Sequence, residues 1–118
     1  MSRHESAVSL RQMRDYASEA MDMVRERVRG DLDTDRMLNL ALVRLLEILG
    51  EAAGRVPLED RGRYPQVPWS QLVSLRNRLI HGYDQVDFDI LWQILTQDLP
   101  PLVQELEAIL ASGRPSPA

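Results

Sequence analysis

The chain lacks cysteine and lysine altogether. Without cysteine, neither a disulfide framework nor a thiolate metal site can form. Without lysine, Schiff-base chemistry and catalysis by a lysine general base are excluded. All 14 basic residues are arginine, and biased composition explains this better than a functional need does.

Long apolar runs are also missing, and the N-terminal residues contain no apolar signal core. A membrane span needs roughly 20 apolar residues and a secretory signal needs an apolar segment. We therefore expect a cytoplasmic protein with no membrane association. The net charge of −4 argues against a protein that coats nucleic acid non-specifically, because such binding requires a broad basic surface. A small, locally basic cleft is compatible with this charge.

Apolar side chains recur at helical spacing along most of the chain. They repeat every three or four positions over residues 5–29, 31–54, 68–82 and 87–110. No stretch shows the alternation of apolar and polar side chains that is typical of a strand. We therefore predict an all-α fold, an up-and-down bundle of four main helices.

Prolines and glycines mark the boundaries of this bundle. Residues 56–67 contain two prolines and a glycine and are typical of a connection. Pro100-Pro101 lies inside the fourth apolar pattern, so we expect the last helix to be interrupted there. The 118 residues are enough for one domain, which we place at 1–111, followed by a flexible C-terminal tail at 112–118.

Polar side chains that could take part in catalysis or binding gather in residues 74–83, Ser-Leu-Arg-Asn-Arg-Leu-Ile-His-Gly-Tyr. On a helix, Arg76 and His81 would be about 140° apart around the axis and about 7.5 Å apart along it. They could converge on one ligand if the helix ends at Gly82. Asn77 precedes His81 by four positions and would share a helix face with it.

These residue types suit the cleavage of RNA by its own 2′-hydroxyl. A guanidinium matches phosphate oxygens, and imidazole side chains exchange protons near neutral pH. The reaction needs both a base and an acid, yet the other histidine, His4, lies at an N-terminus that we expect to fray. A two-fold dimer would supply a second His81 and a second Arg76, so we predict a homodimer with a composite site. From the residues alone, Arg76, Arg78 and His81 could equally be capping or solvated side chains at a helix end.

Several blocks of the sequence resemble the HepT-like branch of the HEPN superfamily, the RNase toxins paired with minimal nucleotidyltransferase (MNT) antitoxins. The blocks lie at residues 47–53, 63–69 and 75–83, followed by Val86-Asp87 and Asp98-Leu99-Pro100. The resemblance implies a metal-independent endoribonuclease toxin of a type II/VII-like toxin–antitoxin system. It also implies a HEPN-like homodimeric helical bundle, an RNA substrate and an MNT-type antitoxin partner, and it implies no cofactor and no bound metal.

The resemblance also assigns roles within the third block. The catalytic arginine and histidine of the family fall on Arg76 and His81, and the polar neighbour falls on Asn77. The tyrosine that receives AMP from the antitoxin falls on Tyr83. An added nucleotide there would bring bulk and negative charge to the cleft and repel RNA. A half-buried capping aromatic is the alternative role for Tyr83.

Two more side chains are assigned supporting or RNA-binding roles, Arg78 within the motif and Glu51 on the second helix. Glu51 follows Gly50, where small residues allow another helix to approach closely. As an alternative, Glu51 is a surface glutamate with a favourable partner.

The alternative function is a non-catalytic HEPN module that binds a nucleotide or serves as the partner subunit of a nucleotidyltransferase. No base-reading motif or aromatic stacking platform is evident in the sequence, so the RNA target stays open.

Overall fold

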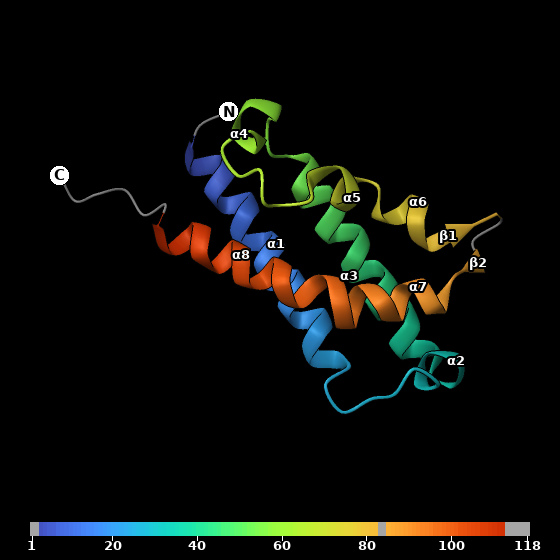
Figure 1. Ribbon diagram of the computed structural model, residues 1–118. Coiled ribbons are helices and arrows are strands. Elements are labelled where there is room, and N and C mark those ends of the chain that lie inside the picture. Colours follow the sequence, from blue (N-terminus) through green and yellow to red (C-terminus); the bar gives the residue numbers. More distant parts are fainter. Residues whose placement is uncertain (1–2, 83–84, 113–118) are drawn as a thin grey trace.

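Three long helices form the framework of the molecule in the computed structural model, which describes residues 3–82 and 85–112. They are α1 (Arg3–Met23), α3 (Arg36–Gly54) and α8 (Leu99–Ser112). Helix α1 packs against both α3 and α8, and α1 and α3 run in opposite directions (Figure 1). The predicted all-α fold is confirmed, with one short hairpin as an addition.

Shorter elements connect these three helices. They are α2 (Asp31–Thr34), α4 (Leu58–Arg61), α5 (Trp69–Val73), α6 (Leu75–Leu79), β1 (Ile80–His81), β2 (Gln85–Val86), α7 (Phe88–Gln93) and the π-helical turn η1 (Ile94–Asp98). Strands β1 and β2 form an antiparallel pair. Among the described residues, no helix combines the length and the apolar character that crossing a membrane would require.

Helix α1 ends earlier than its apolar pattern predicts. It stops at Met23 rather than near residue 29, and Val28 is 67% exposed instead of buried. The chain then turns into α2, and the extended backbone of Asp35 separates α2 from α3. The carboxylate of Asp35 accepts the backbone N–H of Leu38 at 3.0 Å, which satisfies one of the free donors in the first turn of α3.

The core lies where the apolar stripes of the long helices meet. Burial of such large aliphatic side chains is the main favourable contribution to folding. The largest fully buried side chains come from α1, α2, α3, α6, α7, η1 and α8: Met13, Leu32, Leu42, Leu46, Leu49, Leu75, Leu79, Leu91, Ile94, Leu95, Leu99 and Leu106. Helices α3 and α5 approach each other closely at Gly50, because a Cβ there would meet the carbonyl oxygen of Leu72 at 2.8 Å. The predicted close approach at Gly50 is confirmed.

Polar contacts hold the connection between α3 and α5 in place. Arg61 donates from Nε to the carbonyl of Val56 at 2.8 Å, and its guanidinium lies 5.9 Å from the ring centre of Trp69. Trp69 in turn donates from its indole nitrogen to the carbonyl of Tyr64 at 3.0 Å. This connection therefore fixes the start of α5, which precedes the segment with the reactive groups.

The last helix is irregular, but the irregularity lies before the prolines and not at them. Pro100 and Pro101 belong to the first turn of α8, and the π-helical turn η1 precedes them. The Leu99 N–H donates to the Ile94 carbonyl, five residues back. Proline has no N–H to donate and its ring crowds the preceding turn, so a wider turn lets the chain continue. The last helix was predicted to be interrupted at Pro100-Pro101, and this position is wrong, because the irregular turn lies at Ile94–Asp98.

Candidate active site

The segment that carries the reactive groups is not the single helix that its spacing predicts. It consists of α5, a break at Ser74, α6 and then β1. The Ser74 hydroxyl donates to the Ser70 carbonyl at 2.7 Å, in competition with regular backbone bonding. Helix α6 ends at Leu79, and Ile80 has extended backbone angles.

His81 lies on a strand, so the prediction that it occupies the last helical turn is wrong. Its backbone pairs with Gln85 across the hairpin, and the Asp87 N–H donates to the Leu79 carbonyl at 2.8 Å, closing the hairpin onto the end of α6. Consequently Asn77 and His81 do not share a helix face. Gly82, with φ of +47°, provides the left-handed conformation at the turn that other residues rarely adopt.

The two arginines of the motif have different surroundings. Arg78 is about one-third exposed, and its Nη2 lies 3.3 Å from the Asp98 carboxylate on η1. Arg76 is exposed, and the described residues provide it with no ion-pair partner. Asn77 is also exposed. Arg78 therefore anchors α6 to the last helix, while the Arg76 guanidinium is open to an anionic ligand.

A shallow groove of about 300 Å³ lies between α3 and the α5–α6 segment. Arg76 lines one side of it, and Glu47 and Glu51 line the other. Arg44 lies 3.9 Å from Glu47 and 3.8 Å from Glu51. The structure therefore brings Glu51 to the same groove as Arg76, although His81 is not among the residues that line it.

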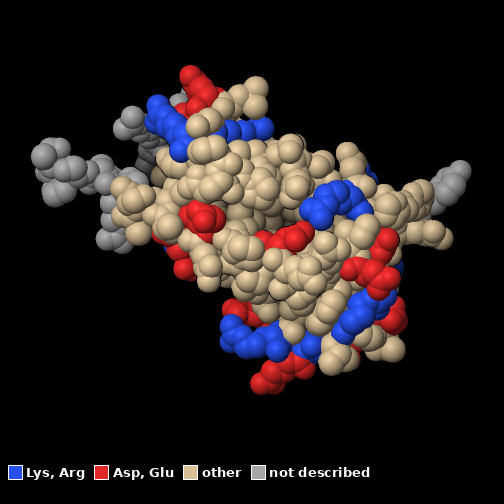
Figure 2. Space-filling model, in the orientation of Figure 1, with Lys and Arg blue, Asp and Glu red and all other residues tan. Residues whose placement is uncertain are grey.

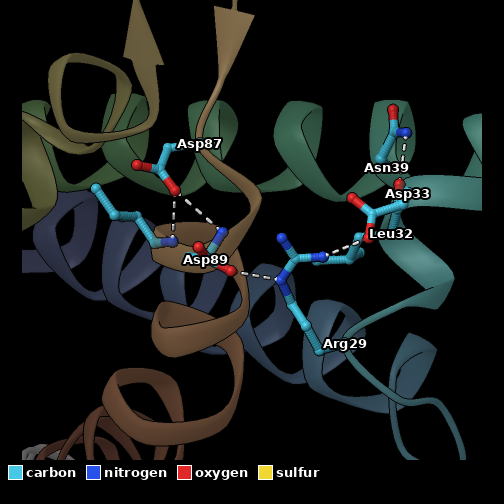
Figure 3. Close-up of polar contacts among 7 residues, drawn as sticks. Arg29, Leu32, Asp33, Asn39, Asp87 and Asp89 are labelled. Atoms are coloured by element: carbon cyan, nitrogen blue, oxygen red, sulfur yellow. Dashed lines mark hydrogen bonds and ion pairs between the residues drawn. The ribbon is translucent and has the colours of Figure 1, made fainter.

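The imidazole of His81 is 59% exposed, and its Nε2 lies 3.7 Å from Oδ2 of Asp87. The other carboxylate oxygen of Asp87 accepts the backbone N–H groups of Asp89 and Ile90 at 3.0 and 3.1 Å, capping α7 (Figure 3). The sequence marks Asp87 only as the first residue of the fourth helical pattern and as part of a family block. Its second contact, with His81, was missed, because it depends on the hairpin that the sequence does not reveal.

A second polar network lies next to this cap. Arg29 donates to Asp89 at 2.7 Å and to Asp33 at 2.8 Å (Figure 3). The pKa of Arg29 is raised above its ordinary value, mainly by the side-chain hydrogen bond to Asp89. These contacts join the chain after α1 to α2 and α7, and they support the helix that Asp87 caps.

Charges of both signs are mixed over the face of the molecule shown in Figure 2, with no continuous basic track. Tyr83, predicted to be the site of AMP attachment, lies outside the described residues.

The chain matches a family of known proteins along most of its length. The family described as "Ribonuclease HepT-like" matches residues 13–109. The chain belongs to the HepT-like ribonuclease family. The matched region includes the groove, the Arg76–His81 segment and Asp87, and the predicted HEPN-superfamily membership is confirmed.

Several named relatives support the membership of this HepT-like chain. "Putative RNase MJ1380" of Methanocaldococcus jannaschii is 31% identical over 92% of this chain and 100% of its own length. "Putative RNase TTE0752" of Caldanaerobacter subterraneus subsp. tengcongensis is 38% identical over 72% of this chain and 80% of its own length. "Probable ribonuclease HepT" of Thermococcus cleftensis is 32% identical over 78% of this chain and 87% of its own length. No solved structure matches the chain.

Proposed function

We propose that this HepT-like chain is the endoribonuclease toxin of a toxin–antitoxin system, and that it cleaves RNA without a metal ion at a site shared by two protomers. The observation that carries the proposal is the contrast within one motif, where Arg78 is paired with Asp98 and the Arg76 guanidinium is open. An accessible imidazole follows five residues later on β1. Cleavage by an internal nucleophile needs both an accessible cation and a proton-exchanging group.

In the proposed reaction, one His81 removes the proton of the RNA 2′-hydroxyl. The 2′-oxygen then bonds to the adjacent phosphorus, and the bond from phosphorus to the 5′-oxygen breaks. The second His81 of the dimer gives a proton to the leaving 5′-oxygen, and Arg76 stabilises the charge that builds on the phosphoryl oxygens. The products are a 2′,3′-cyclic phosphate and a free 5′-hydroxyl. DNA lacks the 2′-hydroxyl and is not cleaved.

The exposed face of α3 is the proposed contact with the second protomer. Met37 and Leu40 are 84% and 53% exposed on this helix. Farther along the same face, Arg44 lies beside Glu47 and Glu51, so a second copy would meet both signs of charge. Because the face leads to the groove lined by Arg76, docking there would extend the groove across the seam between the protomers.

The test measures the rate at which the wild-type chain, Arg76→Ala and His81→Ala cleave a mixture of RNAs in a buffer that contains EDTA. Positioned acid–base groups contribute about 10²-fold to 10⁴-fold to a rate, so each variant should lose at least about 100-fold in activity while staying folded. Arg25→Ala is the control, because Arg25 is exposed on the surface beyond α1. Full activity of His81→Ala would refute the catalytic proposal. RNA or nucleotide binding without turnover would instead favour a non-catalytic binding module.

The antitoxin part of the proposal concerns Tyr83. A nucleotidyltransferase partner would join the α-phosphorus of ATP to the tyrosine oxygen, with pyrophosphate as the leaving group and the phenolic proton passing to a base. This step rests on the family resemblance. Incubation with the partner and ATP should increase the mass of the chain by AMP and abolish cleavage, and Tyr83→Phe should prevent the mass increase. AMP attached at another residue would contradict the assignment.

A further inference from the structure

Asp87 makes three kinds of contact in the region around His81, one through its backbone and two through its carboxylate. Its backbone N–H donates to the Leu79 carbonyl at 2.8 Å. Its Oδ1 accepts two N–H groups at the start of α7, and its Oδ2 lies 3.7 Å from Nε2 of His81. The aspartate is therefore a fixed group against which an otherwise exposed imidazole can be oriented.

We propose that Asp87 is a positioning residue that holds the His81 imidazole with Nε2 directed towards its carboxylate. This inference rests on the proposed function for its catalytic consequence. With Nε2–H facing Oδ2, Nδ1 is the ring nitrogen left to exchange a proton with the substrate. A carboxylate behind a histidine fixes the ring orientation and the position of its proton, as such partners do in other acid–base sites.

The geometry sets the expected size of this effect. A separation of 3.7 Å is longer than a direct hydrogen bond, and the side chains of His81 and Asp87 are 59% and 35% exposed. The contact is therefore a partly screened charge–dipole or ion-pair interaction. Its main role is to restrict the rotation of the ring, and loss of a carboxylate that orients a metal-ligating histidine, a comparable case, costs about 10-fold to 100-fold in metal affinity or activity. We expect the lower end of this range.

Capping and positioning by Asp87 can be separated by substitution. Asparagine and serine cap helices nearly as well as aspartate, so Asp87→Asn and Asp87→Ser should keep the melting temperature of the wild-type chain. Neither presents a carboxylate to His81. Both should therefore lose about 10-fold in kcat at unchanged KM, because RNA is still bound. Asp87→Ala should lose stability as well, because the cap is removed.

Asp89→Asn is the matched control. Asp89 is two residues farther along, and its carboxylate pairs with Arg29 and not with His81. This variant should keep the wild-type kcat. Wild-type kcat in Asp87→Ser would overturn the proposal, because a residue that only caps α7 is replaceable by serine.

A second measurement does not depend on cleavage. Carbon-13 relaxation of the His81 ring reports how well the imidazole is ordered, and the order parameter should fall in Asp87→Asn and Asp87→Ser but not in Asp89→Asn. An unchanged order parameter in the two Asp87 variants would overturn the positioning role. If the wild-type chain cleaved no RNA, the proposed function would fail, and the ring measurement would still decide whether Asp87 positions His81.

Discussion

At the scale of single residues, the environment of the two motif arginines is the most informative finding. Arg76 and Arg78 are identical in type and two positions apart, and the sequence assigns a catalytic role to Arg76 and a supporting or RNA-binding role to Arg78. The structure pairs Arg78 with Asp98 and leaves Arg76 on the rim of the groove. This difference depends on where α6 begins after the break at Ser74, and local composition does not reveal that break.

Substitution of Arg78 tests whether it also contacts RNA. The Arg78–Asp98 pair is partly exposed, and such pairs are worth about 1 kcal/mol or less, so Arg78→Ala and Asp98→Asn should both change the free energy of unfolding only slightly. If Arg78 contacts a phosphate, Arg78→Ala alone should reduce the salt dependence of RNA binding, by about 0.7 in the slope of log K against log salt for a single strand. Asp98→Asn keeps the cation and serves as the control. Equal slopes in all three proteins would exclude a phosphate contact by Arg78.

At the scale of elements, the approach of α5 to α3 at Gly50 positions the groove. The sequence indicates a close approach through its run of small residues, and the structure identifies the Leu72 carbonyl as the group that meets α3. The hairpin was not predicted, because strands of two residues are too short to produce an alternating pattern. The buried pair in which the Ser6 hydroxyl donates to Asp60 also depends on residues far apart in the chain.

The substitution Gly50→Ala should push α5 away from α3. The substitution gains about 1 kcal/mol in helix propensity, but its Cβ would lie 2.8 Å from a backbone oxygen, and overpacking of this kind costs about 1–3 kcal/mol. We therefore expect lower stability in urea unfolding and weaker RNA cleavage. Gly54→Ala is the control, since nothing lies within 4 Å of a Cβ at Gly54. Equal stability of the two variants would show that α5 moves away at no cost.

At the scale of the whole molecule, much of the architecture could be predicted from the sequence. Helical periodicity identified the long helices and most of their buried faces, since it follows directly from burial of one side. It did not locate the end of α1 or the π-helical turn, which depend on caps, prolines and packing against other elements. The family blocks point to residues 75–83 as the site, and the local geometry of that segment follows from tertiary contacts.

Assembly of two protomers is the prediction at this scale. Replacing Met37 and Leu40 together by aspartate puts two charges on the exposed face of α3, and it should convert the proposed dimer to a monomer and abolish cleavage. Sedimentation velocity would measure the oligomeric state. Val28→Asp is the control, because Val28 is also exposed but lies outside α3. A dimer that survived the double substitution would place the contact on another face.

The π-helical turn has a consequence for how this chain tolerates length changes. Relative to a regular α-helix, a turn closed over five residues accommodates one extra residue. Deleting a single residue from 94–98 would remove that extra residue and restore regular winding, with α7 and α8 kept nearly in phase. The same deletion made within α8 would instead rotate the segments on either side of it by about 100° relative to each other. The π-helical turn is therefore the part of the last helix where a change of one residue in length is best tolerated, and a deletion there should be far less damaging than replacement of the imidazole.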